Sequence, residues 1–279
     1  MNNIEAISQH LNKLRQLTQL DIQPQWYLSS EISLTNPTEE ILENIAPLNE
    51  NHYITWEKGH QVQWLTQQVT IPFYLADYPL DGFSLRLSLA WWAEEAQIYV
   101  NGKLAQAGDL FDSSTRIILT ESAQPGESLN IILRLVSPGH DIGGLMRSRL
   151  IYEREFPDID PGFVADELAV LAQYWQAFEP EKLENLLIAL NDINWEKVGD
   201  RNLFDQSLTT LRQNLKPLAQ NIKEREFCLL GHAHLDMAWL WPLAETWEVG
   251  VRTFHSVLDL QQEFSDNLWP YQSHFIRMD

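Results

Sequence analysis

The strictest constraint on the fold of this 279-residue chain is a stretch, residues 61–152, in which apolar and polar residues alternate. The alternation is clear in Leu85-Arg-Leu87-Ser-Leu89, and Ile131–Val136 forms a longer apolar run. Successive residues of a strand point to opposite faces, so each of these segments has one buried face. Asn101-Gly102 suits a two-residue hairpin turn, because both positions accept a positive φ. The pattern predicts an antiparallel β-sandwich or jelly roll.

Apolar residues at helical spacing flank this stretch. Five of them near the N-terminus predict a flanking helix: Ile4, Ile7, Leu11, Leu14 and Leu17. Residues from about 23 to 57 predict an irregular connection with short strands. After the linker Phe156–Gly162, three stripes predict helices: Val164, Leu168, Leu171 and Trp175; Leu183, Leu187 and Leu190; Phe204, Leu208, Leu211, Leu215, Leu218 and Ile222. Pro217 should end or kink the last of these near Leu215, because proline lacks the N–H donor and clashes with the preceding turn.

In one segment of the chain, residues of types that bind metal ions occupy every second position. A four-residue apolar run of strand length, Phe227–Leu230, ends at a glycine and is followed by His232, His234 and Asp236. In extended backbone, side chains two residues apart project to the same side, so an imidazole and a carboxylate can converge on one cation at roughly 2.0–2.2 Å. A single His beside a strand is more often a hydrogen-bonded core or surface residue. The repeated spacing at a strand end favours a zinc site here.

Two tryptophans come directly after the metal-ligand pattern. Trp239 and Trp241 offer indole faces on which the C–H faces of a sugar ring can stack. Beyond them Trp247, Val251, Phe254, Leu258 and Gln261 trace one face of a helix. The order strand, loop, helix is one β/α unit, whose site residues lie at the C-terminal end of the strand.

Three segments carry a resemblance to a known family: Gly231-His-Ala-His-Leu-Asp-Met-Ala-Trp-Leu-Trp-Pro242, Glu245-Thr-Trp247 and Arg252-Thr-Phe-His-Ser-Val-Leu258. They resemble the opening of the catalytic domain of family 38 glycoside hydrolases, the retaining α-mannosidases. The resemblance implies that His234 and Asp236 bind Zn²⁺ and that Trp239 lines the subsite of the mannose being cleaved. It gives His232 at most a supporting role behind the ligands.

The resemblance also implies what surrounds these residues. The strand and helix would be the first β/α unit of an α/β barrel, incomplete in this chain. A retaining glycosidase needs two carboxylates about 5–5.5 Å apart. In this family the nucleophile, the acid/base and a further His ligand come later than position 279, so we expect no catalytic residue in this chain and no activity of the chain alone. Residues 269–279 depart from the family pattern, which indicates a truncated or frame-shifted reading or a natural split.

The alternating stretch resembles the galactose-binding-like sandwich that precedes the barrel in the cytosolic and vacuolar α-mannosidase branch. The resemblance rests on Trp91-Trp92, Ile98-Tyr-Val-Asn-Gly-Lys103, Gly108-Asp-Leu-Phe-Asp112 and Leu135-Val-Ser-Pro-Gly-His-Asp141. Such a sandwich can bind sugar. A pair like Trp91-Trp92 more often fills a core or a contact between domains, and that is the expectation here.

Composition limits the partners of the chain. The net charge is −20, from 19 Lys and Arg against 39 Asp and Glu, so nucleic acid and anionic membrane surfaces would be repelled. The one cysteine, Cys228, cannot form an internal disulfide and fits a reducing, cytoplasmic setting. No apolar signal or spanning segment is visible. The expected ligand is a mannose-containing oligosaccharide, and a homo-oligomer or a second chain that completes the barrel is the expected protein partner.

Four regions are therefore expected: an N-terminal helix and lead-in (1–60), the β-sandwich (61–155), a helical bridge (156–225) and the start of the catalytic domain (226–279). The fold class is mixed β and α/β, and the function is zinc-assisted hydrolysis of terminal α-mannosyl residues. Two alternatives stay open. A metal-dependent amidohydrolase would use both His232 and His234 as ligands and leave Asp236 unbound. The other is a non-catalytic carbohydrate-binding or assembly fragment.

Overall fold

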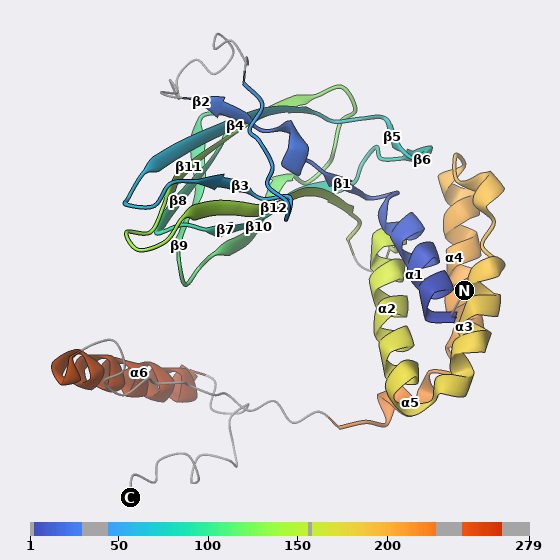
Figure 1. Ribbon diagram of the computed structural model, residues 1–279. Coiled ribbons are helices and arrows are strands. Elements are labelled where there is room, and N and C mark those ends of the chain that lie inside the picture. The colour runs from blue at the N-terminus through green and yellow to red at the C-terminus, as the bar shows by residue number, and fades with distance from the viewer. Residues whose placement is uncertain (1–2, 30–43, 156–157, 227–241, 264–279) are drawn as a thin grey trace, which may run out of the picture. The chain divides into compact units, whose positions relative to one another are not determined.

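The computed structural model describes residues 3–29, 44–155, 158–226 and 242–263 (Figure 1). The chain divides into two compact units, residues 1–224 (unit 1) and residues 225–279 (unit 2), and each is a separate body. In the described ranges, none of the helices has the length and apolar character needed to cross a lipid bilayer.

Two antiparallel five-stranded sheets form the β part of unit 1. The first sheet has the order β1 (Gln19–Asp21), β12 (Gly143–Glu153), β7 (Ser84–Trp92) and β10 (Ser114–Thr120), and β3 (Ile54–Trp56) also pairs with β12. The second has the order β2 (Tyr27–Ser29), β4 (Val62–Thr70), β11 (Ser128–Val136), β8 (Glu95–Val100) and β9 (Lys103–Asp109). A small hairpin joins β5 (Tyr74–Leu75) to β6 (Tyr78–Pro79). The antiparallel β structure expected from the alternation is confirmed, and the jelly-roll connection remains a prediction.

Inward side chains of both sheets belong to one buried cluster. The inward residues of β7 are Leu85, Leu87, Leu89 and Trp91, and those of β11 include Ile131 and Leu133. Each of these is at most 1% exposed. Burial of each large apolar side chain stabilises the fold by about 1.5–3 kcal/mol before the loss of chain entropy is counted. The alternation seen in the sequence is thus the alternation between this core and the outer faces.

The neighbouring tryptophans on β7 have different environments. Trp91 is fully buried, and its Nε1 donates a hydrogen bond to the carbonyl oxygen of Asp109 at 3.2 Å. Trp92 is 36% exposed, because the next residue of a strand points to the opposite face. The core role expected for the pair therefore holds for Trp91, while Trp92 lies on the surface.

The predicted hairpin turn and the predicted short strands before residue 61 are both present in the structure. Asn101 (φ 49°) and Gly102 (φ 77°) form the two-residue connection between β8 and β9, which confirms the hairpin. Residues 19–56 contribute β1 and β3 to the first sheet and β2 to the second, so short strands before residue 61 extend both sheets.

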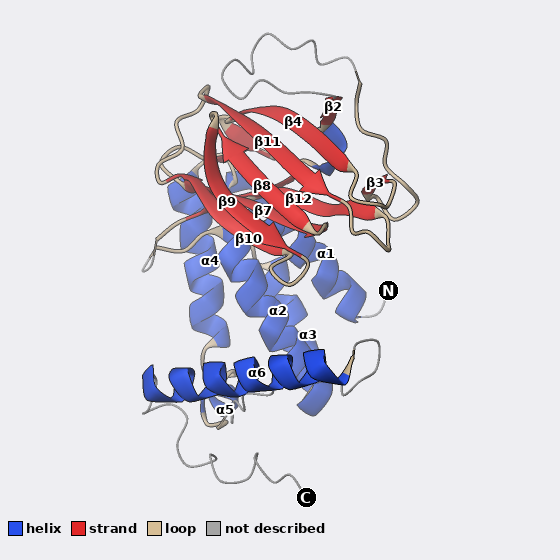
Figure 2. Cartoon of the chain, turned by 90° about the vertical axis from the view of Figure 1, so that its left-hand side faces the viewer, coloured by secondary structure: helices blue, strands red, loops and turns tan. Residues whose placement is uncertain are grey.

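Helices make up the rest of unit 1 (Figure 2). They are α1 (Asn3–Arg15), α2 (Pro161–Phe178), α3 (Leu183–Asn191), α4 (Arg201–Leu215) and α5 (Gln220–Lys223), with 3₁₀ turns at Gln23–Gln25, Pro180–Lys182 and Trp195–Lys197. Helix α1 packs against α2 and α3, and α4 also contacts α2 and α3. The predicted stripes face this interior: Ile7, Leu11, Leu14, Val164, Leu168, Trp175, Leu183, Leu190, Phe204, Leu208 and Leu211 are all buried. Helix α4 ends at Leu215, as the position of Pro217 predicted.

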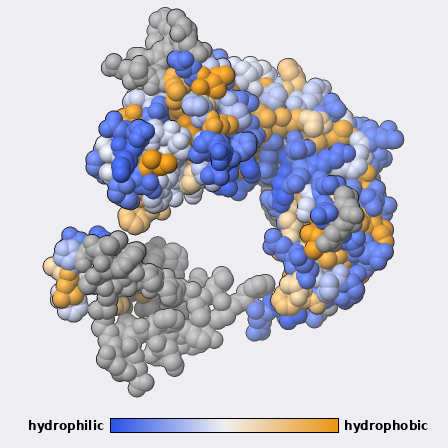
Figure 3. All heavy atoms as spheres, viewed as in Figure 1, coloured by the Kyte–Doolittle hydropathy of each residue, from blue (hydrophilic) through white to orange (hydrophobic). Residues whose placement is uncertain are grey.

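The surface of unit 1 is largely hydrophilic in the view of Figure 3, with separate hydrophobic side chains among the polar ones. Phe111, in the loop after β9, is 98% exposed, and Phe73 is 62% exposed. Single apolar side chains of this kind are normal on a folded surface.

Unit 2 has one described element, helix α6 (Leu243–Glu263). The predicted strand Phe227–Leu230 lies outside the described residues. The barrel, of which it would be the first strand, therefore remains a prediction.

Candidate functional site

The residues predicted to bind metal and substrate fall in the segment 227–241, outside the described residues. This applies to His232, His234, Asp236 and Trp239. Of the described residues, no three or more His, Cys, Asp or Glu side chains are grouped so that they could hold a metal ion. The zinc site remains a prediction from the motif, and the nearest described element of unit 2 is the helix on its C-terminal side.

Helix α6 begins directly after the motif. The carbonyl oxygen of Pro242 accepts hydrogen bonds from the backbone N–H of Glu245 at 3.0 Å and of Thr246 at 3.1 Å. The Thr246 hydroxyl lies 3.4 Å from the same oxygen. The helix predicted after the motif is therefore confirmed, and its first turn is fixed within a few residues of Trp239.

One side of α6 carries large apolar residues at intervals of four and three. Trp247 is 73% exposed, Val251 53%, Phe254 37% and Leu258 48%. A shallow depression runs along the helix and is lined by Trp247, Glu248, Val251, Arg252, His255, Ser256 and Asp259. An isolated helix is only marginally stable in water, and such a stripe normally packs against another element. The stripe is consistent with the helix of a β/α unit, whose apolar side faces its strand.

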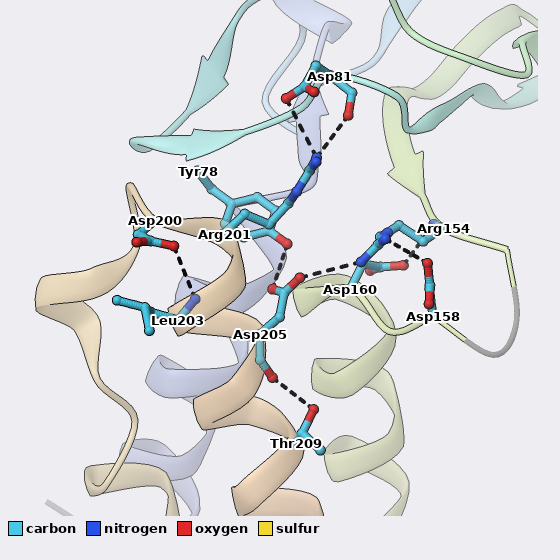
Figure 4. Close-up of polar contacts among 10 residues, drawn as sticks. All are labelled: Tyr78, Asp81, Arg154, Asp158, Asp160, Asp200, Arg201, Leu203, Asp205 and Thr209. Atoms are coloured by element: carbon cyan, nitrogen blue, oxygen red, sulfur yellow. Dashed lines mark hydrogen bonds and ion pairs between the residues drawn. The ribbon is translucent and has the colours of Figure 1, made fainter.

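Three raised pKa values occur together in unit 1, in a polar cluster that sequence reasoning did not identify (Figure 4). The Tyr78 hydroxyl donates to Asp205 Oδ1 at 2.8 Å, and Arg154 Nη1 lies 3.5 Å from Asp205 Oδ2. The backbone N–H of Arg154 donates to Asp160 Oδ2 at 3.2 Å. Arg201 Nη1 donates to the carbonyl oxygen of Asp81 at 2.8 Å. The cluster thus links α2 and α4 to β6 and to the end of β12.

Burial is the main cause of the altered pKa values in this cluster. It raises the pKa of Asp205 to about 6, although the hydrogen bond from Tyr78 and the positive charges of Arg154 and Arg201 oppose the rise. Burial also raises the pKa of Tyr78, and the neighbouring Asp205 carboxylate raises it further. The pKa of Asp160 is raised by burial against the effect of three backbone N–H groups.

The polar cluster has a structural explanation. Asp160 precedes Pro161 and caps α2, since its Oδ1 accepts from the Phe163 N–H at 2.8 Å. Asp205 joins α4 to β6 through Tyr78 and to the residue that follows β12 through Arg154. Altered pKa values often mark active sites, but ion-pair networks that join elements also produce them. The Asp-Pro pair before an apolar stripe could have been recognised as a helix start from the sequence; the contact of Tyr78 with Asp205 had no sequence signal.

Comparison with known families gave one match, over the segment that contains the motif. Residues 224–276 match the family model described as the glycosyl hydrolases family 38 N-terminal domain. The match covers the motif segment and α6. A comparison with curated proteins gave no match.

Three solved structures illustrate what the chain is similar to. A Faecalibacterium prausnitzii β-glucuronidase has 16% identity and a TM-score of 0.32, covering 42% of this chain and 20% of its own. A putative β-galactosidase from Bacteroides fragilis has 16% identity and a TM-score of 0.36, covering 50% and 24%. A Bacteroides uniformis β-glucuronidase 2 has 15% identity and a TM-score of 0.37, covering 49% and 18%. The chain spans about a quarter or less of the length of these proteins, and at these scores they support no conclusion about function.

Proposed function

We propose that this chain is part of a family 38 glycoside hydrolase that cleaves terminal α-mannosyl residues by a retaining mechanism. The observation that carries the proposal is the match of residues 224–276 to the N-terminal domain of that family, over the segment that contains the motif. The substrate would be a mannose-containing oligosaccharide, and the single cysteine suits action in the cytoplasm.

The residues of the motif have distinct roles in this proposal. His234 and Asp236 would hold Zn²⁺, and their imidazole nitrogen and carboxylate oxygen are ligand types that zinc takes in proteins. When bound, the ion would supply Lewis-acid coordination for sugar hydroxyls. Trp239 would pack its indole against the mannose ring and exclude water from that side. The family resemblance assigns neither of the two reacting carboxylates to a residue of this chain.

Zinc binding by the chain tests the ligand assignment without depending on turnover. The motif supplies two ligands, whereas a catalytic zinc site has about three protein ligands and one open position. Zinc should therefore bind weakly and exchange readily. Calorimetric titration should show that His234→Ala and Asp236→Ala each reduce this binding. Addition of a polypeptide that carries the remainder of the catalytic domain should raise the affinity by orders of magnitude, because the ligands then join a preorganised site.

His232→Ala is the matched control, since it removes an imidazole two positions from His234. Its effect on zinc binding should be smaller than that of either ligand variant. Loss of zinc binding in His232→Ala, together with unchanged binding in Asp236→Ala, would contradict the mannosidase assignment. That pattern would instead support a metal-dependent amidohydrolase in which both histidines are ligands.

A further inference from the structure

The outer face of the first sheet in unit 1 carries arginines from three neighbouring strands. They are Arg86 on β7, Arg116 on β10, and Arg147 and Arg149 on β12, and together they are called the arginine face. Their positions alternate with buried residues such as Leu87 and Leu150. Four arginines share this face in a chain whose net charge is −20.

On this face, the strand register places two small residues of β7 between residues of the two flanking strands. Ser88 pairs with Arg149 on one side and with Arg116 on the other. Adjacent strands lie about 4.7–4.9 Å apart, so the backbones of the two arginines are separated by about 10 Å with the serine between them. Ala90 pairs in the same way with Arg147 and Ser114. The face therefore has the small side chains Ser88 and Ala90 on β7, flanked on the β12 side by Arg149 and Arg147. On the β10 side Arg116 lies opposite Ser88, and its guanidinium is paired with Glu153.

A β-bulge in β12 brings Arg147 onto this face. Leu145 pairs with Trp91, but Arg147 pairs with Ala90, the next residue of β7, so Met146 is the extra residue. Without the extra residue, Leu145 and Arg147 would point to the same side of the sheet. With it, Leu145 is buried and Arg147 is exposed.

Only part of the positive charge on the arginine face is neutralised within the described structure. Arg86 Nε lies 2.6 Å from Glu153 Oε2, and Arg116 forms an ion pair with the same carboxylate. Among the described residues, Arg147 and Arg149 have no ion pair. Asp21 lies opposite Arg149 in the register, where its Oδ1 accepts a hydrogen bond from the Gln23 backbone N–H at 3.0 Å.

An exposed aromatic ring lies at the end of the same face. Trp92 is two residues along β7 from Ala90, a distance of about 7 Å. Its Nε1 donates to Asp141 Oδ2 at 3.2 Å, which holds the indole in place. On β12 it pairs with Gly144, which has no side chain, and the next position across the sheet is the exposed Thr55. The position beside Trp92 on β12 therefore carries no side chain.

We propose that the arginine face and Trp92 bind an anionic oligosaccharide, one whose rings carry carboxylate or phosphate groups. Arginine binds both groups with two parallel N–H donors, and an indole packs against the C–H face of a sugar ring. The spacing of about 7 Å from Trp92 to Ala90, and about 13 Å to Ser88, fits a chain of two or three rings. This site belongs to unit 1, whereas the zinc motif belongs to unit 2.

Titrations of the whole chain, followed by calorimetry, test this site with defined probes. The probes are trigalacturonate, mannose 6-phosphate, neutral mannotriose, inorganic phosphate and polyglutamate. Binding of trigalacturonate or of mannose 6-phosphate is expected, and the preferred probe identifies the charged group. Mannotriose and inorganic phosphate should bind at least tenfold more weakly than that probe.

Variants then locate the binding. Arg149→Ala and Trp92→Ala should each weaken it at least tenfold, and Arg149→Lys should weaken it less. Arg134→Ala is the matched control, because Arg134 lies on the second sheet in an ion pair with Glu95 at 2.8 Å. It should leave binding unchanged. Trigalacturonate should also bind equally well with and without zinc, which separates this proposal from that of the zinc site.

Several results would overturn the proposal. If both charged sugars fail to bind, or if Arg134→Ala weakens binding as much as Arg149→Ala does, the proposed site is ruled out. Equally tight binding of inorganic phosphate would show that the face holds an ion without recognising sugar, and equal binding of mannotriose would remove the role of charge. If polyglutamate binds more tightly than either charged sugar, and this binding survives Trp92→Ala, the arginine face would bind an acidic protein surface instead.

Discussion

Replacing Asp205 with Asn should change how the stability of unit 1 depends on pH. The Asp205 side chain is 14% exposed and accepts a hydrogen bond from Tyr78 at 2.8 Å. Burial raises its pKa from 3.8 to about 6. The folded protein therefore binds a proton at this carboxyl at pH values where the unfolded chain has already released it.

The sign of the effect comes from this difference. Because the folded-state pKa is higher, the stabilising contribution of the protonated carboxyl is fully present below pH 4 and is lost as the pH rises through about 6. At about 1.4 kcal/mol for each pKa unit, the full rise corresponds to about 3 kcal/mol. Solvent screening of this partly accessible carboxyl reduces the expected effect to about 1–2 kcal/mol. Asn at this position does not titrate.

Chemical denaturation of both proteins at pH 4, 5, 6 and 7 provides the measurement. The free energy of unfolding of Asp205→Asn, relative to the original protein, should rise by about 1–2 kcal/mol from pH 4 to pH 7. Carbon NMR of the carboxyl should give a pKa near 6. Tyr78→Phe should raise this pKa further, because the Tyr78 hydrogen bond lowers it. A relative stability that is flat or falls over this range, or a carboxyl that titrates near pH 4, would refute the reasoning.

Two further predictions concern single side chains of unit 1. Trp91→Ala should reduce the free energy of unfolding by about 3–5 kcal/mol because it leaves a cavity in the core, whereas Trp92→Ala should reduce it by less than about 1 kcal/mol. Thermal melts followed by circular dichroism measure both losses. Equal losses would contradict the opposite orientations of the two rings. Asp160→Ala should cost about 1–2 kcal/mol at pH 7 because it removes the N-cap of α2, and urea denaturation should show no comparable loss for Asp158→Ala if capping is the cause.

Much of unit 1 could be predicted from local sequence patterns. The alternation in β7 fixes which side chains are buried, the stripe from Phe204 to Leu215 fixes the buried face of α4, and Pro217 fixes its end. These features depend on the strand period of two and the helix period of 3.6, and on the missing N–H of proline. The predicted zinc ligands His234 and Asp236 depend on a short motif in the same way. Their arrangement lies outside the described residues, so that part of the site remains a prediction.

The sequence by itself therefore determined the main helices and strands of unit 1 and the buried sides of elements such as β7 and α4, and it predicted the residue types of a zinc and sugar site. Tertiary structure decided which elements meet. Tyr78 and Asp205 are 127 residues apart in the chain, and their hydrogen bond exists only because β6 lies beside α4. The bulge at Met146 reverses the alternation of β12, so that Arg147 lies on the outer face with Arg149. A local pattern records the side of each residue within one element, but pairing register and packing between distant elements depend on the free energy of the whole fold.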